Sequence, residues 1–281
     1  MIIKTISEIK KNLNKQKNSG KKIAFVPTMG ALHDGHLALI KMAQKLADVV
    51  VVSIFVNQTQ FNNADDYKNY PRQDEKDLEK LKNQQVDYIF LPSDSEIFNS
   101  DFSFKIIPTK MVDCLCAKYR PGHFEGVALI ITKLFNIVKP DIAIFGEKDF
   151  QQLAIIKKLA IDLNFDVEIF AHKTVREKTG LAMSSRNQLL SQANKIKAAI
   201  LFETLHEIKK EIKKKPKDLA KILLEKSQFL VKNGFEKIDY LEIRDENNLQ
   251  LISEFNAKIP ARIFVAAFIG KVRLIDNLRI N

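Results

Sequence analysis

The sequence of 281 residues contains only two cysteines, Cys114 and Cys116, separated by a single residue. Two cysteines are too few for a zinc site by themselves, and a pair this close in sequence cannot link distant parts of a secreted domain. We therefore expect reduced thiols in a cytoplasmic protein.

Long apolar runs are also missing. No segment approaches the roughly 18 unbroken apolar residues of a membrane-spanning helix, and the opening stretch MIIKTISEIKKNL has no apolar core of signal-peptide length. Neither membrane association nor secretion is expected. With 46% hydrophobic residues, 28% charged residues and a mean hydropathy of −0.15, the composition is that of a globular protein rather than a disordered or fibrous one.

Negative charge is in deficit: 34 acidic residues face 45 lysines and arginines, which gives a net charge of +11. Such an excess raises the expectation of phosphate-bearing partners, either nucleotides or nucleic acid. Much of it lies in KKNLNKQKNSGKK and HEIKKEIKKKPK, which we interpret as solvated helix faces. Because the lysines are scattered and no basic strand carries aromatic residues of the RNA-recognition type, we expect no nucleic-acid partner.

Two common phosphate-binding motifs, G-x-G-x-x-G and G-x-x-x-x-G-K-[ST], are absent as well. Any phosphate site in this chain would therefore depend on other donors. The candidates are the histidines, Lys148 and Arg186.

Short apolar runs predict the strands of an α/β domain. They occupy residues 23–26, 49–56, 87–92, 142–145 and 167–171. The second run is apolar at nearly every position, which is typical of a strand covered on both faces in a parallel sheet. Between the first two runs, Leu39, Ala43 and Leu46 keep a helical period, as expected for a strand-helix-strand crossover.

The pattern changes after about residue 176, where two predicted helices are followed by three predicted strands. The helices span residues 192–212 and 219–234, and the strands span residues 237–245, 262–270 and 272–280. Gly234 is expected to cap the second helix, and Gly270 to lie in the turn between the last two strands. We expect a nucleotide-binding domain over residues 1–176 and a smaller α+β domain over residues 177–281.

Polar residues follow three of the predicted strands, in the segments PTMGALHDGH, NQTQF and GEKDFQQ. If the sheet is parallel, these three loops share one edge, where helices begin with outward-pointing N–H groups. In the first loop, His33 and His36 stand at a helix start that favours anions. They are either phosphate donors or one capping and one packing histidine, and their spacing leaves both open.

The other loops carry equally ambiguous side chains. Lys148 suits a phosphate and Asp149 a hydroxyl or a metal, unless they form a surface ion pair. Asn57 and Gln60 are suited to orienting a hydroxy acid, or to ending a strand in a polar turn. The segment TGLAMSSRN places two serines before Arg186, in a loop that is either flexible or anion-binding.

The H-x-G-H turn together with these loops resembles the nucleotidylyltransferase superfamily that is related to class I aminoacyl-tRNA synthetases. The match narrows with YPRQDEKDLEKL, RPGHFEGVALIITKLFNIVKPDIAIFGEKDFQQLAIIKKL, GLAMSSRN and VAAFIGKVRLIDN. In order, and along nearly the whole chain, these segments are similar to the pantoate-beta-alanine ligase (pantothenate synthetase) family.

The resemblance implies ATP-dependent condensation of pantoate with beta-alanine through a pantoyl adenylate, with release of AMP and pyrophosphate. It also implies Mg²⁺ accompanying the ATP, a Rossmann-like domain followed by a smaller domain that partly covers the site, and a homodimer. The nearest alternative is a nucleotidylyltransferase of the same superfamily that keeps the nucleotide on its product.

Matching motif by motif, the resemblance assigns catalysis to His36, with support from His33, Lys148, Ser184, Ser185 and Arg186. It assigns ATP binding to Met29, Gly30, Ala31, Leu32, His33, Asp34, Gly35, His36, Gly146, Glu147, Lys148, Asp149, Val175, Met183, Ser184, Ser185 and Arg186. It assigns pantoate and beta-alanine to Gln60, Gln152 and Asn57.

One departure from the family pattern is visible, since Gln58 stands where the family commonly has proline. The turn thereby loses the fixed φ of proline, although Asn57 and Gln60 are retained. The segment RPGHF also matches the family. Arg120 and His123 within it are expected to be site residues, dimer residues or structural residues.

Overall fold

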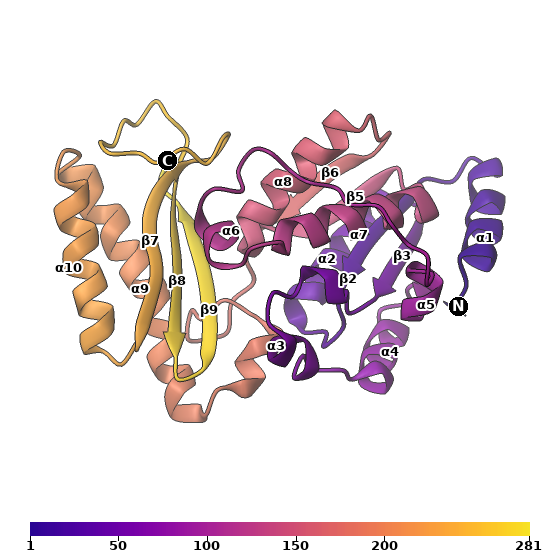
Figure 1. Ribbon diagram of the computed structural model, residues 1–281, viewed down its shortest axis with the longest axis horizontal. Helices are drawn as coiled ribbons and strands as arrows, with labels where there is room; N and C mark the ends of the chain where they lie inside the picture. The colour runs from indigo at the N-terminus through magenta and orange to yellow at the C-terminus, as the bar shows by residue number, and fades with distance from the viewer. The chain divides into compact units, whose positions relative to one another are not determined.

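Six parallel strands form the larger of the two sheets in the computed structural model, which describes residues 1–281 (Figure 1). In chain order they are β1 (Ile2–Ile3), β2 (Ile23–Thr28), β3 (Val49–Ile54), β4 (Tyr88–Phe90), β5 (Ile142–Gly146) and β6 (Glu168–His172). Their order across the sheet is β1-β4-β3-β2-β5-β6, and every pairing is parallel. The predicted Rossmann-like parallel sheet is confirmed.

Apolar residues at successive positions of the central strands are buried because helices pack on both faces of this sheet. On one face, α2 (Asp34–Leu46) and α4 (Asp74–Asn83) share a core with Val26, Val52 and Ile144. The alternate side chains, such as Phe25 and Val51, point to the opposite face and are equally buried. There α7 (His123–Val138) contacts β2 and α1 (Ile6–Asn18).

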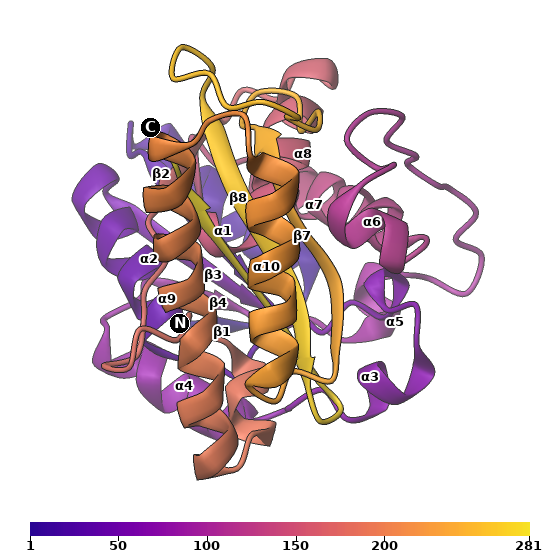
Figure 2. The same cartoon turned by 90° about the vertical axis from the view of Figure 1, so that its left-hand side faces the viewer.

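A second sheet of three antiparallel strands lies in the C-terminal part of the chain. Its strands are β7 (Lys237–Asp245), β8 (Ala261–Ile269) and β9 (Val272–Arg279), in that order. The helices α9 (Gln192–Lys214) and α10 (Leu219–Lys232) lie side by side on one of its faces (Figure 2). Leu205 and Ile208 of α9 share a core there with Ile263 and Val265 of β8.

The remaining elements are short, apart from one further helix. They are η1 (Gln58–Gln60), α3 (Ala64–Lys68), α5 (Asp94–Ile97), α6 (Leu115–Tyr119), η2 (Glu147–Asp149), α8 (Phe150–Asp162) and η3 (Ser185–Leu189), where η denotes a 3₁₀ helix. None of the helices combines the length and apolar character needed to cross a lipid bilayer.

The chain divides into two compact units. Unit 1 comprises Met1–Lys110, Arg120–Glu147 and Ile155–Lys173, and unit 2 comprises Met111–Tyr119, Lys148–Ala154 and Thr174–Asn281. Unit 2 therefore includes α6 and the start of α8, since Cys116 contacts Tyr240 of β7 and the Phe150 ring packs on Phe264 of β8. The predicted boundary between residues 176 and 177 stays a prediction.

Each strand that the sequence predicted lies within a few residues of its predicted position, and one strand is added. The sequence did not predict β1, because two residues are too short to show a period; it pairs with β4 through Ile2 and Ile3. Gly234 follows the end of α10 with φ 91°, and Gly270 turns from β8 into β9 with φ 57°, as predicted. Both cysteines are free and buried, and burial raises the pKa of Cys114 to about 11.

Candidate functional site

The carboxyl ends of β2, β3 and β5 lie next to one another at the centre of the parallel sheet. Thr28 is in register with Ile54, and β2 pairs with β5 on its other side. The strand order reverses direction between β2 and β5, which is the position where α/β sheets bind ligands. The prediction that these three strands end at one edge of a parallel sheet is confirmed.

Both histidines of the first loop cap the helix that follows. His33 is the N-cap of α2, and its Nδ1 accepts a hydrogen bond of 3.1 Å from the Gly35 N–H. The Nδ1 of His36 accepts from the His33 N–H at 3.2 Å, and the ring centroids are 4.1 Å apart. A ring nitrogen that accepts carries no proton, so each neutral ring carries its proton on Nε2. Capping thus fixes the tautomer that can donate to a phosphate oxygen.

The backbone of the loop before these histidines is held by Asp77 of α4, which the sequence analysis did not identify. Its side chain is 0% exposed and accepts from the N–H groups of Ala31 at 2.7 Å and Leu32 at 2.8 Å. Lys80, one turn further along α4, donates to the Leu32 carbonyl. Burial raises the pKa of Asp77, although both backbone N–H groups and Lys80 favour the ionised form.

The sequence contains only a weak signal for Asp77. This residue precedes the buried Leu81 by four positions, so the two side chains lie on the same face of the helix. A buried carboxylate is uncommon, and it calls for partners that only the folded chain supplies. Gly30 lies beside it with φ 79°, a backbone conformation that favours glycine, and a Cβ there would also lie close to the Asp77 carboxylate, at 3.1 Å.

Gln60 lies on η1, after β3, and its side chain is held at both ends. Its Oε1 accepts from Asn57 Nδ2 at 3.0 Å, and its Nε2 donates to the Met29 sulfur at 3.0 Å. Asn57 is 1% exposed; its Nδ2 also donates to the Gly126 carbonyl, and its Oδ1 accepts from Thr59. The contacts of Asn57 therefore orient Gln60. The predicted contacts of Gln60 and Asn57 with pantoate stay predictions.

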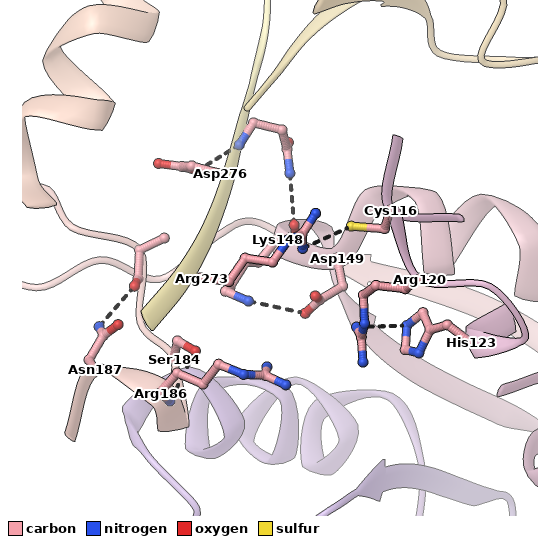
Figure 3. A network of polar contacts seen from close by, with 12 residues as sticks. Cys116, Arg120, His123, Lys148, Asp149, Ser184, Arg186, Asn187, Arg273 and Asp276 are labelled. Carbon is pink, nitrogen blue, oxygen red and sulfur yellow. Dashed lines mark hydrogen bonds and ion pairs between the residues drawn. The ribbon is translucent and has the colours of Figure 1, made fainter. Parts of the chain in front are cut away.

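Arg120 and His123, whose role the sequence left open, contact the backbone of Gln60. The Gln60 carbonyl can only accept, so His123 donates to it from Nδ1 over 2.7 Å. The Nε2 of His123 then accepts from Arg120, 3.2 Å away (Figure 3). These two residues thus lie at the candidate site and act on Gln60 through its main chain.

Gly126 of α7 permits the close approach of η1. A Cβ at this position would lie 2.3 Å from the Thr59 carbonyl oxygen and 2.5 Å from the Gln60 nitrogen, both of which are backbone atoms. We expect Gly126→Ala to lower the free energy of unfolding by about 1–3 kcal/mol through overpacking and, because the sequence predicts that Gln60 binds pantoate, to raise the KM for pantoate. Thermal unfolding and steady-state kinetics measure both.

The matched control for this substitution is Asn136→Ala, an exposed position on the same helix, which should change neither quantity. A Gly126→Ala variant with normal stability and a normal KM for pantoate would contradict the role of this close approach.

The predicted site residues that follow β5 are divided between the two units. Gly146 and Glu147 belong to unit 1, while Lys148, Asp149 and the half-buried Gln152 belong to unit 2. The Lys148 ammonium lies 3.5 Å from the Asp149 carboxylate. This is the ion pair that the sequence left as an alternative, and it does not exclude a ligand role.

The serine-arginine segment of unit 2 is part of an ordered turn. The Met183 N–H donates to the Val175 carbonyl at 3.0 Å, and Arg176 and Ala182 form an antiparallel bridge. Ser184 caps η3 by accepting from the Arg186 N–H at 3.2 Å, and Asn187 donates to the Ala182 carbonyl at 3.1 Å (Figure 3). Ser184, Ser185 and Arg186 therefore follow a hydrogen-bonded hairpin rather than a loose loop.

No group of three or more histidine, cysteine, aspartate or glutamate side chains could hold a metal ion in this chain. Magnesium in nucleotide sites is usually bound by one or two carboxylates and by the substrate phosphates. The residues present are compatible with an ion of that kind. Asp149, whose side chain is 47% exposed, is the carboxylate beside Lys148.

Comparison with known proteins gives full-length matches. The family model for pantoate-beta-alanine ligase matches residues 1–279. The pantothenate synthetase of Caldicellulosiruptor bescii is 44% identical over 278 residues, covering 99% of this chain and 98% of that protein. The pantothenate synthetase of Neisseria meningitidis is 45% identical over 281 residues, covering 100% of this chain and 99% of that protein.

Solved structures match over the same length. The pantothenate synthetase of Thermus thermophilus superposes with a TM-score of 0.91 at 37% identity, covering 99% of both chains. The pantoate-beta-alanine ligase of Francisella tularensis, solved with beta-gamma ATP and beta-alanine, gives a TM-score of 0.82 at 36% identity, covering 100% of this chain and 97% of that one.

Proposed function

The chain belongs to the pantoate-beta-alanine ligase family, and on this premise we propose which of its residues carry out the family's reaction. The protein is an AMP-forming carbon-nitrogen ligase of pantothenate biosynthesis. It condenses (R)-pantoate with beta-alanine through a pantoyl adenylate, releasing AMP and pyrophosphate. The observation that carries this conclusion is the match over residues 1–279.

In the first half-reaction the pantoate carboxylate attacks the α-phosphate of ATP, and negative charge develops on the phosphate oxygens. Fixed donors stabilise such charge without having to reorganise. We assign this role to the Nε2–H groups of His33 and His36, with His36 as the principal donor. Their capping bonds at 3.1 and 3.2 Å support the assignment, because they fix both rings.

We assign binding of the ATP phosphates to the remaining cationic and hydroxyl donors. They are Lys148, Ser184, Ser185 and Arg186. The nucleotide itself is assigned to Met29, Gly30, Ala31, Leu32, His33, Asp34, Gly35, His36, Gly146, Glu147, Lys148, Asp149, Val175 and Met183. Magnesium, when bound with ATP, would neutralise charge on the phosphates, and Asp149 is its candidate protein ligand.

Pantoate is assigned to Gln60 and Gln152, and beta-alanine to the neighbourhood of Gln60. The Gln60 side-chain amide accepts from Asn57 and donates to the Met29 sulfur, and His123 donates to the Gln60 backbone carbonyl. These bonds support the assignment, because they hold the side chain and the main chain of Gln60 in one orientation. In the second half-reaction the beta-alanine amine attacks the adenylate carbonyl and AMP leaves. No covalent bond to the protein is needed. Shielding of the adenylate by residues 177–281 is part of the proposal, as are a homodimer and a cytoplasmic location.

Pyrophosphate release tests the function when pantoate and beta-alanine are supplied with ATP separately and together. We expect a single turnover of pyrophosphate with pantoate alone and sustained release with both substrates. Free AMP should appear only when beta-alanine is present. A nucleotidylyltransferase would instead keep the nucleotide on its product, so AMP that stays attached to an organic acid in the presence of beta-alanine would contradict the ligase reaction.

A further inference from the structure

Two consecutive polar residues of β9, Asp276 and Asn277, are each only 4% exposed, and the assigned reaction has no role for them. Consecutive residues of a strand point to opposite faces of the sheet. Asp276 lies in register with Val265, whose face packs against α9, whereas Asn277 lies in register with Phe264, whose ring contacts Phe150 of α8. The two side chains therefore reach different segments of unit 2.

Asn277 holds the backbone at Lys148. Its Nδ2 donates to the Lys148 carbonyl at 2.9 Å, and its Oδ1 accepts from the Arg262 guanidinium at 2.6 Å. Arg262 in turn lies 4.0 Å above the Phe150 ring. The amide of Asn277 thus has a fixed orientation, with its N–H group directed at the residue that we assign to the phosphates.

Asp276 holds the hairpin that leads to the serine-arginine segment. Its carboxylate accepts two hydrogen bonds from Arg176, at 2.6 and 2.9 Å. Arg176 also donates to the Gly180 carbonyl at 3.0 Å and forms a bridge with Ala182, two residues before Ser184. A bidentate arginine-carboxylate pair restricts direction as well as distance. The Asp276 carboxylate also accepts from the Asn277 N–H at 2.7 Å, which joins the two anchors.

We propose that Asp276 and Asn277 are positioning residues that keep Lys148 and the segment Ser184–Arg186 in a fixed relation, so that both bind the same nucleotide triphosphate. Neighbouring positions on one strand cannot move apart, so the two phosphate-binding segments share a rigid support. This inference rests on the proposed function and deepens it, because it concerns how that site is held together rather than which groups touch ATP.

The test is Asn277→Asp in the full-length protein. Aspartate still accepts from Arg262 but cannot donate to the Lys148 carbonyl. We therefore expect a folded protein that keeps the contact with Arg262 and loses the hydrogen bond to Lys148. Pyrophosphate release with pantoate should slow by about 10- to 100-fold, the usual effect of a small displacement of a catalytic group. Reaction of preformed pantoyl adenylate with beta-alanine should be unchanged, since pyrophosphate has already left.

The matched control is Asn247→Asp, which makes the same charge change at an exposed turn of unit 2 and should leave both half-reactions unchanged. Melting temperatures are measured for every variant, and Asn277→Ala serves as a second variant. A folded Asn277 variant with the wild-type rate of pyrophosphate release would overturn the inference, as would equal slowing of both half-reactions.

Double-mutant cycles separate positioning from a general structural effect. If Asn277 acts through Lys148, then Asn277→Asp should slow pyrophosphate release no further in a Lys148→Ala background. Asp276→Asn should likewise add nothing to Arg186→Ala. Additive effects in both cycles would contradict the inference. A wild-type protein without pantoate-dependent pyrophosphate release would instead contradict the proposed function itself.

Discussion

Replacing His36 by alanine is expected to slow formation of the pantoyl adenylate by about 10²- to 10³-fold, the scale measured when one fixed donor to a developing oxyanion is removed. The physical reason is the Nε2–H group, whose direction is set because Nδ1 accepts from the His33 N–H. Single-turnover cleavage of ATP in the presence of pantoate measures the rate. A rate near that of the wild type would remove His36 from the mechanism.

Stability must be followed in the same experiment, because His36 also takes part in the cap of α2. Loss of a capping interaction costs about 0.5–2 kcal/mol, which should lower the melting temperature without unfolding the protein. His36→Gln is the matched variant, since glutamine at this helix position can accept the same backbone bond. We expect it to recover stability but not the rate. Lys41→Ala, at an exposed position of the same helix, should affect neither.

Replacing Asp77 by alanine is expected to give the largest loss of stability among these variants. Both carboxylate oxygens accept buried backbone N–H groups, from Ala31 and Leu32. Each amide left without a partner costs about 1–3 kcal/mol. The same loop leads into His33, so the affinity for ATP should fall as well. Urea unfolding and calorimetric titration with ATP measure the two effects.

Asp77→Asn is the milder variant, because one side-chain oxygen remains to accept a bond. Its loss of stability should lie between those of the wild type and the alanine variant. Asp74→Asn, at an exposed position in the first turn of the same helix, is the control and should change neither quantity. Normal unfolding and ATP affinity in Asp77→Ala would show that the loop keeps its conformation without this carboxylate.

The sequence by itself was enough to predict the parallel sheet, since nearly unbroken, β-branched apolar runs such as residues 49–56 are typical of strands covered on both faces. Once the sheet is parallel, the polar loops after β2, β3 and β5 must share one edge. The start of α2 at the two histidines could also be predicted from neighbouring residues alone, because the helical period begins there. The segments RPGHF and LIDN match the family pattern in the sequence, but the match gave no role to His123, Asp276 or Asn277.

Only the tertiary structure decided what holds the functional groups in place. Asp77 reaches a loop 45 residues earlier, His123 donates to a carbonyl 63 residues earlier, and Asn277 donates to one 129 residues earlier. The assignment of Met111–Tyr119 and Lys148–Ala154 to unit 2 rests on similarly distant contacts. Local sequence patterns report which face of an element is buried. They do not report which distant donor, acceptor or backbone atom meets that face, because packing of the whole chain sets those partners.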